Sequence, residues 1–106
     1  MFARKHVAKD GHTCDSLAEK IIDDWLFRRH IEHRRAIKYP GNPSLTVDFI
    51  VGSYWIEFFG LYGEHTRYDE LRREKLQLAK QHKLHLIELY PKDISRLAVK
   101  LKSIML

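Results

Sequence analysis

The sequence predicts a single α/β domain with the element order αβββαβα. Two β-rich runs meet at the two-residue turn Gly52-Ser53, a pattern typical of a tight antiparallel hairpin. Apolar residues recur at helical spacing on either side of that hairpin. With 106 residues, the chain has room for one hydrophobic core but not for a second.

Hydrophobic periodicity and turn residues set the bounds of each element. Helices are expected where apolar residues follow helical spacing behind a capping residue, and strands where β-rich runs lie between Gly or Pro signals. A polar, flexible arm over residues 1–10 precedes the domain, which spans 11–106. The expected elements are a helix over 17–29, a strand over 31–39, hairpin strands over 46–51 and 54–59, a helix over 67–81, a strand over 84–90 and a helix over 93–104.

The charge of the chain favours a polyanionic partner such as nucleic acid. Lysine and arginine outnumber aspartate and glutamate by 19 to 14, which gives a net charge of +5. Basic residues gather between the first helix and the first strand, which predicts a track that binds DNA phosphates. A solvated, charged edge strand that discourages aggregation is the alternative. The predicted track consists of Arg28, Arg29, Arg34, Arg35 and Lys38.

Cysteine and histidine usage argues against a disulfide or a zinc motif. Cys14 is the single cysteine, which suits a reducing compartment. The histidines show no ligand spacing with cysteine or with one another, and His12 is expected to act as a base or phosphate donor or to be solvated. Without a secretory segment or an apolar run of about 18 residues, we expect no membrane span and a cytoplasmic location.

The Gly52-Ser53 turn sets the hairpin register and places Asp48 opposite Glu57. Opposed side chains have Cβ atoms roughly 4.5 to 5.5 Å apart, so two carboxylates there repel each other unless something neutralises them. Apolar neighbours on the same face predict that the pair is buried. Carboxylate oxygens favour Mg²⁺ or Mn²⁺ with several waters retained. Two solvated charges with a basic side chain between them are the alternative.

Lys75 and Glu19 are the other candidates. Lys75 interrupts the apolar stripe of the second helix, so its ammonium is expected to reach Asp48, Glu57 or a bound phosphate. A snorkelling lysine at the helix boundary is the alternative. Glu19 lies on the first helix beside its apolar face. The spacing of Ser16 and Glu19 also spells a capping box, so Glu19 either supports the site or caps the helix.

These candidate residues and the short motifs around them together resemble the PD-(D/E)xK nuclease superfamily, particularly its small very-short-patch-repair-like and resolvase-like members. The resemblance implies a restriction-endonuclease-like fold, with a mixed four-stranded central sheet flanked by helices. It also implies that Asp48 and Glu57 bind Mg²⁺, that Mn²⁺ may substitute, and that an acidic residue on the first helix assists. The resemblance covers about residues 10 to 98 and rests on Asp10-Gly11-His12, Ser16, Glu19, Val47-Asp48-Phe49, Ile56-Glu57-Phe58-Phe59-Gly60, Tyr68 and Lys75.

The chain departs from the family pattern at Phe59, which stands where the family carries a lysine that orients or activates water. Some relatives supply that lysine from the following helix, and Lys75 is placed to do so. The resemblance therefore implies a Mg²⁺-dependent endodeoxyribonuclease, structure-selective or nicking, with catalytic residues Glu19, Asp48, Glu57 and Lys75. A homodimer would permit two cuts, and a companion DNA-binding protein would supply targeting. The alternative is a catalytically inactive nuclease-fold module that binds nucleic acid or a partner protein.

Overall fold

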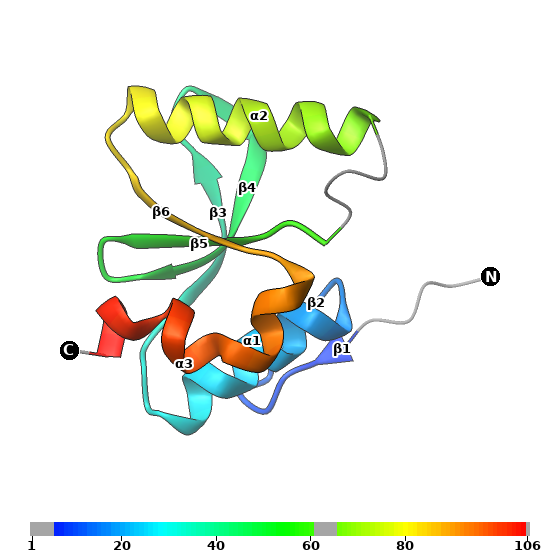
Figure 1. Ribbon diagram of the computed structural model, residues 1–106, viewed down its shortest axis with the longest axis vertical. Helices are drawn as coiled ribbons and strands as arrows, with labels where there is room; N and C mark the ends of the chain where they lie inside the picture. Colours follow the sequence, from blue (N-terminus) through cyan, green and yellow to red (C-terminus); the bar gives the residue numbers. More distant parts are fainter. Residues whose placement is uncertain (1–5, 61–65, 106) are drawn as a thin grey trace.

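A four-stranded mixed sheet with helices on both faces forms the frame of the protein (Figure 1). The structure is a computed structural model that describes residues 6–60 and 66–105. The strand order is β3-β4-β5-β6, in which the first two pairings are antiparallel and the third is parallel. The strands are β3 (Arg34–Tyr39), β4 (Asn42–Val51), β5 (Tyr54–Phe58) and β6 (His85–Leu89).

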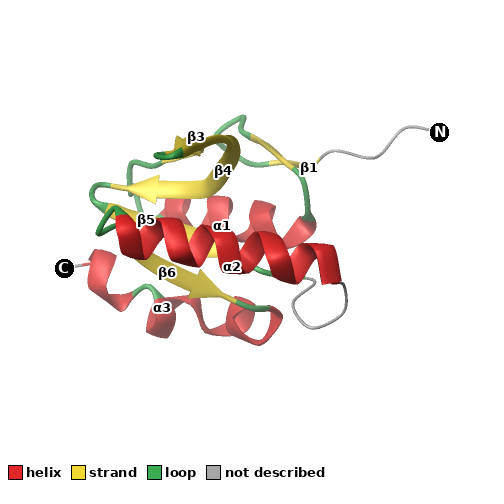
Figure 2. Cartoon of the chain, turned by 90° about the horizontal axis from the view of Figure 1, so that it is seen from above, coloured by secondary structure: helices red, strands yellow, loops and turns green. Residues whose placement is uncertain are grey.

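Two apolar clusters join the helices to the sheet. The larger one lies between the sheet and the layer of α1 and α3, and the smaller one lies beneath α2 on the other face. Figure 2, seen from above, looks onto α2 with the strands beneath it. The helices are α1 (Leu17–Arg28), α2 (Thr66–Gln81) and α3 (Leu97–Lys100), with 3₁₀ turns η1 (Pro91–Arg96) and η2 (Lys102–Met105) beside α3. The larger cluster contains Ile22, Leu26, Phe49, Val51, Ile56, Leu89, Leu97 and Leu101.

The predicted hairpin register is confirmed. Val51 pairs with Tyr54, and the pairing continues outward through Phe49 and Ile56, so the next opposed positions are those of Asp48 and Glu57. Gly52 has a φ of 58°, as the first position of a primed hairpin turn requires. The α/β class and the mixed four-stranded sheet are likewise confirmed.

The sheet is distorted beside Asp48. Ala36 has a φ of 53° and lies opposite Asp48, between the regular pairs on either side of it. Val47 and Ile50 both belong to the cluster beneath α2, although strict alternation along a strand would place them on opposite faces. A left-handed alanine costs roughly 1–2 kcal/mol, and such distortions re-aim neighbouring side chains. The irregularity therefore falls at the predicted metal ligand.

Strand β4 begins at Asn42, four residues before its predicted start, and capping contacts change the extent of two further elements. The first strand begins at Arg34 rather than at residue 31, because the Ile31 amide donates to the carbonyl of Leu26 and closes the end of α1. The predicted helix over 93–104 is divided into η1, α3 and η2. At its start, the Tyr90 amide donates to the Asp93 carboxylate, which holds the chain in a tight 3₁₀ turn. Both differences arise from capping contacts at element ends.

Residues 6–10 of the predicted flexible arm contact the rest of the domain. Strand β1 (His6–Val7) pairs with β2 (Thr13–Cys14) in a small second sheet, beside α1 in Figure 1. The Lys9 amide donates to the buried Asp24 carboxylate of α1 at 2.7 Å, which anchors this segment. The rest of the predicted arm, residues 1–5, lies outside the described residues. Within the described ranges, no helix has the length and apolar character needed to cross a membrane.

Candidate active site

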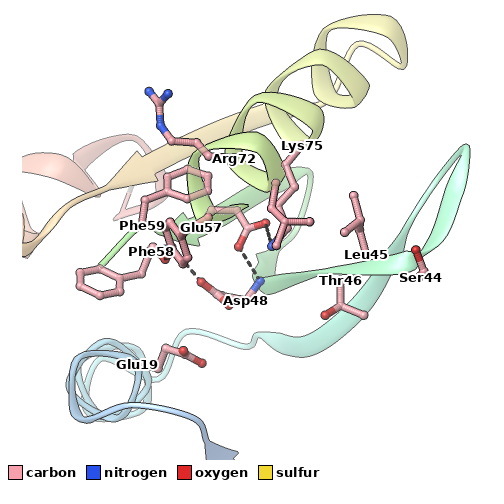
Figure 3. A pocket seen from close by; sticks show the side chains of 12 residues that line it. Glu19, Ser44, Leu45, Thr46, Asp48, Glu57, Phe58, Phe59, Arg72 and Lys75 are labelled. Carbon is pink, nitrogen blue, oxygen red and sulfur yellow. Dashed lines mark hydrogen bonds and ion pairs between the residues drawn. The ribbon is translucent and has the colours of Figure 1, made fainter. Parts of the chain in front are cut away.

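A pocket of about 290 Å³ contains all four residues predicted to be catalytic (Figure 3). Asp48 and Glu57 come from the β4–β5 hairpin, Lys75 from α2 and Glu19 from α1. The hairpin turn sets the first two side by side, and the helices on the two faces of the sheet bring the others to them. The structure thus joins residues that are separated by up to 56 positions in the chain, from 19 to 75.

Glu57 and Lys75 form a buried ion pair. The Lys75 Nζ atom lies 2.8 Å from Glu57 Oε2, and the Tyr39 hydroxyl donates to the same oxygen at 2.7 Å. Only 1% of the Glu57 side chain and 19% of the Lys75 side chain are exposed. The prediction that Lys75 reaches an anion is confirmed, with Glu57 as that anion. Because the oxygen already has two donors, the carboxylate is held in one orientation.

Asp48 is held by the backbone of the opposite strand. Its Oδ2 atom accepts from the Phe58 amide at 2.8 Å, and its own amide lies 3.3 Å from Glu57 Oε1. Burial, followed by the negative charges of Glu57 and Glu19, raises the pKa of the Asp48 carboxyl well above its ordinary value, although the Phe58 amide and Lys75 oppose the shift. This carboxylate lies where a further cation would be most stabilising.

Glu19 combines the two roles that its sequence context left open. Its amide donates to the Ser16 hydroxyl at 3.1 Å, which caps α1, and the hydroxyl in turn lies 3.4 Å from Glu19 Oε2. At the same time, Arg35 Nη2 lies 2.9 Å from Glu19 Oε1, and the side chain lines the pocket. Helix capping and a position at the pocket therefore coexist in one residue.

Phe59 and Arg72 pack together at the edge of the pocket. Phe59 is buried, with its ring 5.8 Å from that of Tyr90 and 5.6 Å from the Arg72 guanidinium. This position therefore serves packing, and a lysine here would disturb it. Arg72 lines the same pocket and also contacts the Tyr90 hydroxyl at 2.8 Å. Sequence reasoning missed Arg72, although its i,i+3 spacing from Lys75 places both cations on one side of α2.

The predicted phosphate track divides into exposed and enclosed residues. Arg28, Arg29, Arg34 and Lys38 are exposed, and their contact with nucleic acid stays a prediction. Arg35, the fifth residue of the predicted track, is largely enclosed, with 13% of its side chain exposed. Its guanidinium donates to the Asp48 carbonyl at 3.0 Å and to Glu19 at 2.9 Å, while its Nε atom is buried with no partner among the described residues. Arg35 thus links α1 to β4.

Sequence reasoning also missed a second cluster of ionisable groups. In the described part of the chain, the group of three or more potential ligands that converge on a point consists of Asp10, His12, Asp23 and His33. Burial raises the pKa of the Asp23 carboxyl, and the neighbouring His33 and His12 oppose the shift. His12 is therefore neither a lone base nor a merely solvated turn residue. The spacing of these four residues in the sequence matches no metal-ligand motif, because they come from three separate segments.

Comparisons with family models, with curated proteins and with solved structures find no match to this chain. The resemblance to the PD-(D/E)xK superfamily stays a prediction from short sequence motifs. The side chains of the pocket and the charge of the chain are therefore the features that bear on function.

Proposed function

We propose that the protein is a metal-dependent endodeoxyribonuclease with a restriction-endonuclease-like domain. Asp48 and Glu57 would hold Mg²⁺, with Mn²⁺ as a substitute, and phosphodiester bonds of DNA would be hydrolysed in the pocket. The observation that carries the proposal is the ion pair of 2.8 Å between Lys75 and Glu57, beside Asp48. A lysine on a separate helix thereby reaches the paired acids, as the absence of a lysine at Phe59 requires.

The chemistry of the acids suits a hard divalent cation. Carboxylate oxygens are the ligands that Mg²⁺ prefers, and Mg²⁺ is commonly bound by one or two carboxylates with waters completing the shell. No described residue donates to Asp48 Oδ1, while Oδ2 is oriented by the Phe58 amide. Burial and repulsion from Glu57 and Glu19 raise the pKa of Asp48, and a cation at the carboxylates would relieve the repulsion. When bound, such an ion supplies charge neutralisation on the phosphate and lowers the pKa of a coordinated water.

The protein groups around the acids would position the reactants. The Tyr39 hydroxyl and the Lys75 ammonium hold Glu57 in one orientation, and Lys75 retains further N–H donors for a water or a phosphate oxygen. Arg72 also lines the pocket, but its guanidinium pairs with Glu88 at 3.3 Å and with the Tyr90 hydroxyl, so Lys75 is the cation paired with these acids. In the reaction, the water oxygen bonds to phosphorus while the P–O ester bond breaks, and the leaving alkoxide takes up a proton.

The surface favours DNA as the substrate without favouring a particular sequence. The net charge of +5 and the exposed Arg28, Arg29, Arg34 and Lys38 suit contacts with phosphates, which position a duplex but do not read bases. A single small domain offers little surface for base readout, so we propose structure-selective cutting or nicking. A homodimer or a companion DNA-binding protein would extend that surface.

A cleavage assay tests the proposal. Supercoiled plasmid, branched DNA and single strands are incubated with the protein and Mg²⁺, Mn²⁺ or EDTA. We expect metal-dependent cleavage that is lost in Asp48→Asn and in Lys75→Ala. Asp15→Asn and Lys80→Ala remove the same charges at exposed positions and should cleave like the wild type.

Each outcome of the assay has a defined meaning. Wild-type cleavage by Asp48→Asn would eliminate this pocket as the active site, and wild-type cleavage by Lys75→Ala would remove the role of Lys75 alone. The buried position of Phe59 favours one rival, an inactive module that keeps the fold. Binding of branched DNA without cleavage in any of the ions would establish that rival.

A further inference from the structure

A second cluster, formed by Asp10, His12, Asp23 and His33, is separate from the pocket, and its α1 member Asp23 lies four residues after the pocket residue Glu19. His12 Nδ1 is 2.9 Å from Asp23 Oδ2, and His33 Nε2 is 2.9 Å from Asp23 Oδ1. Both of these nitrogens lie 3.0 Å from Asp10 Oδ2. One ligand atom from each of the four residues falls within 4.8 Å of the other three. Three segments, namely the β1–β2 turn, α1 and the loop before β3, thus meet at one point.

The hydrogen bonds of His33 determine which of its nitrogens faces the acids as an acceptor. Its Nδ1 atom lies 2.8 Å from the Ile31 carbonyl, which can only accept, so Nδ1 carries a proton. In the neutral ring, Nε2 then directs a lone pair toward the carboxylates of Asp23 and Asp10. A lone pair that faces carboxylate oxygens is favourable when a cation lies between them. A backbone carbonyl that orients a histidine in this way is the usual outer partner of a metal ligand.

The buried oxygen of Asp10 is the second observation that points to a ligand. Asp10 Oδ2 is shielded from solvent and accepts no hydrogen bond from any described residue, although both histidine nitrogens lie 3.0 Å away. The atom is therefore near potential partners that do not direct a proton at it. A buried carboxylate oxygen without a donor is costly unless it is paired or binds a metal.

We propose that Asp10, His12, Asp23 and His33 form a tetrahedral site for a divalent transition-metal ion of the zinc class. Zinc takes imidazole nitrogen and carboxylate oxygen at about 2.0–2.2 Å, which corresponds to ligand-to-ligand edges of about 3.3–3.6 Å in a tetrahedron. With either oxygen of Asp23 as the ligand atom, three of the six edges measure 2.9–3.0 Å. Two aspartates balance the charge of one divalent ion while both imidazoles stay neutral. Imidazole nitrogen also favours zinc, cobalt, nickel or iron over Mg²⁺.

The surroundings of the cluster are those of a structural ion. The Asp23 side chain is fully buried and that of His33 is 4% exposed, whereas 37% of the His12 side chain faces solvent. A surface hollow that includes Phe27 and His30 leads to these residues and provides the entry path. Four protein ligands leave no open position for a substrate, so the ion would stabilise rather than catalyse. It would hold the N-terminal hairpin and the start of β3 against α1.

Metal content and cobalt absorption test the site on the full chain. The protein is stripped with a chelator, dialysed and reconstituted with Zn²⁺ or Co²⁺, and bound metal is measured by mass spectrometry. We expect one ion per chain and, with Co²⁺, the intense visible bands of a tetrahedral complex. The proposal would be overturned if the stripped and reconstituted wild type failed to take up one ion per chain. Asp48→Asn should bind Zn²⁺ like the wild type, so the result is independent of DNA cleavage.

Ligand variants locate the ion. His12→Gln alters the most exposed ligand and is the least disruptive to folding, and His33→Gln alters an enclosed one. Removing even an outer partner lowers metal affinity by roughly 10- to 100-fold, so we expect at least that loss in each variant, together with loss of the cobalt bands. His30→Gln, which lines the same hollow without joining the cluster, should bind like the wild type. Wild-type affinity in both His12→Gln and His33→Gln would overturn the ligand assignment.

Discussion

The two ionisable clusters differ in what faces their carboxylates. In the pocket, Glu57 is paired with the ammonium of Lys75 and the hydroxyl of Tyr39, so the protein supplies its own cation. In the second cluster, Asp10 and Asp23 face two imidazoles, which carry no fixed charge. Under our two proposals, the first arrangement binds its metal beside an internal ion pair, whereas the second would be completed by an ion. Aspartate and glutamate would thus build a catalytic pocket in one region and a structural metal site in the other, depending on their partners.

The comparison also concerns which parts of the chain are joined. The pocket is built on the rigid β4–β5 hairpin and on α2, whereas the second cluster gathers a short N-terminal hairpin, α1 and a loop. Arg35 connects the two regions, since it lies two residues after His33 and donates to Glu19 and to the Asp48 carbonyl. We therefore expect a substitution in one region to leave the stability of the other unchanged. A change of geometry in one region should still affect the geometry of the other through Arg35.

Breaking the internal ion pair should have the largest effect. Lys75→Met keeps the apolar stem but leaves the buried Glu57 carboxylate without its cation, which costs about 3–5 kcal/mol of unfolding free energy. Glu57→Gln in the Lys75→Met background removes the unpaired charge and should restore most of that loss. Urea denaturation of the single and double variants measures both effects, and Lys80→Met serves as the exposed control. Equal stability of single and double variants would show that Glu57 does not depend on Lys75.

Zinc should stabilise one region without acting through the other. At a free Zn²⁺ concentration 100 times the dissociation constant, we expect the unfolding free energy to rise by about 2.7 kcal/mol in the wild type and in Asp48→Asn. The increase should vanish in His33→Gln, because that variant lacks a ligand of the second cluster. Millimolar Mg²⁺ should leave the cobalt bands unchanged, since imidazole ligands disfavour it. Displacement of Co²⁺ by Mg²⁺ would show that the two ions share a site.

Asp48 should reverse the usual effect of pH on stability. A carboxyl whose pKa is raised in the folded state binds its proton more tightly there than in the unfolded chain. Its contribution is therefore fully present below the ordinary value of 3.8 and is lost as the pH rises toward the folded-state pKa. Asp48→Asn should raise the melting temperature of the metal-free protein at neutral pH and flatten its pH dependence. Thermal melts from pH 3 to 8 measure this, and a lower melting temperature for Asp48→Asn at pH 7 would contradict it.

Sequence patterns within single elements predicted the residues of the pocket. The features that were not predicted depend on contacts between residues far apart in the chain. The Gly52-Ser53 turn alone set the register of Asp48 and Glu57, and the interrupted apolar stripe identified Lys75. The contact of the N-terminal segment with α1 was not predicted, because it depends on a hydrogen bond from the Lys9 amide to a buried acceptor 15 positions away. The ion pair of Arg35 with Glu19 was not predicted, because a charged strand residue looks the same in sequence whether it faces solvent or a buried glutamate.

The second cluster was missed for a related reason. Its ligands span positions 10 to 33 and lie on a turn, a helix and a loop, so neither helical nor strand spacing connects them. Only the fold of the N-terminal hairpin onto α1 brings them together. Metal-ligand motifs are visible in sequence when one element carries two ligands at a regular interval. Here, Asp10 and His12 are the one closely spaced pair.

The smallest expected effect comes from substituting His30, which lies near the proposed metal ligand His33 but is not itself a proposed ligand. His30 ends α1 with a φ of 56° in a Schellman motif, with the Ile31 amide donating to the Leu26 carbonyl, and Lys83 ends α2 likewise with a φ of 55°. Because glycine adopts this conformation without strain, His30→Gly and Lys83→Gly should each add about 1 kcal/mol to the unfolding free energy in urea. Zn²⁺ affinity should be unchanged in both. A weaker affinity in His30→Gly alone would make His30 a fifth member of the cluster and exclude the closed four-ligand site.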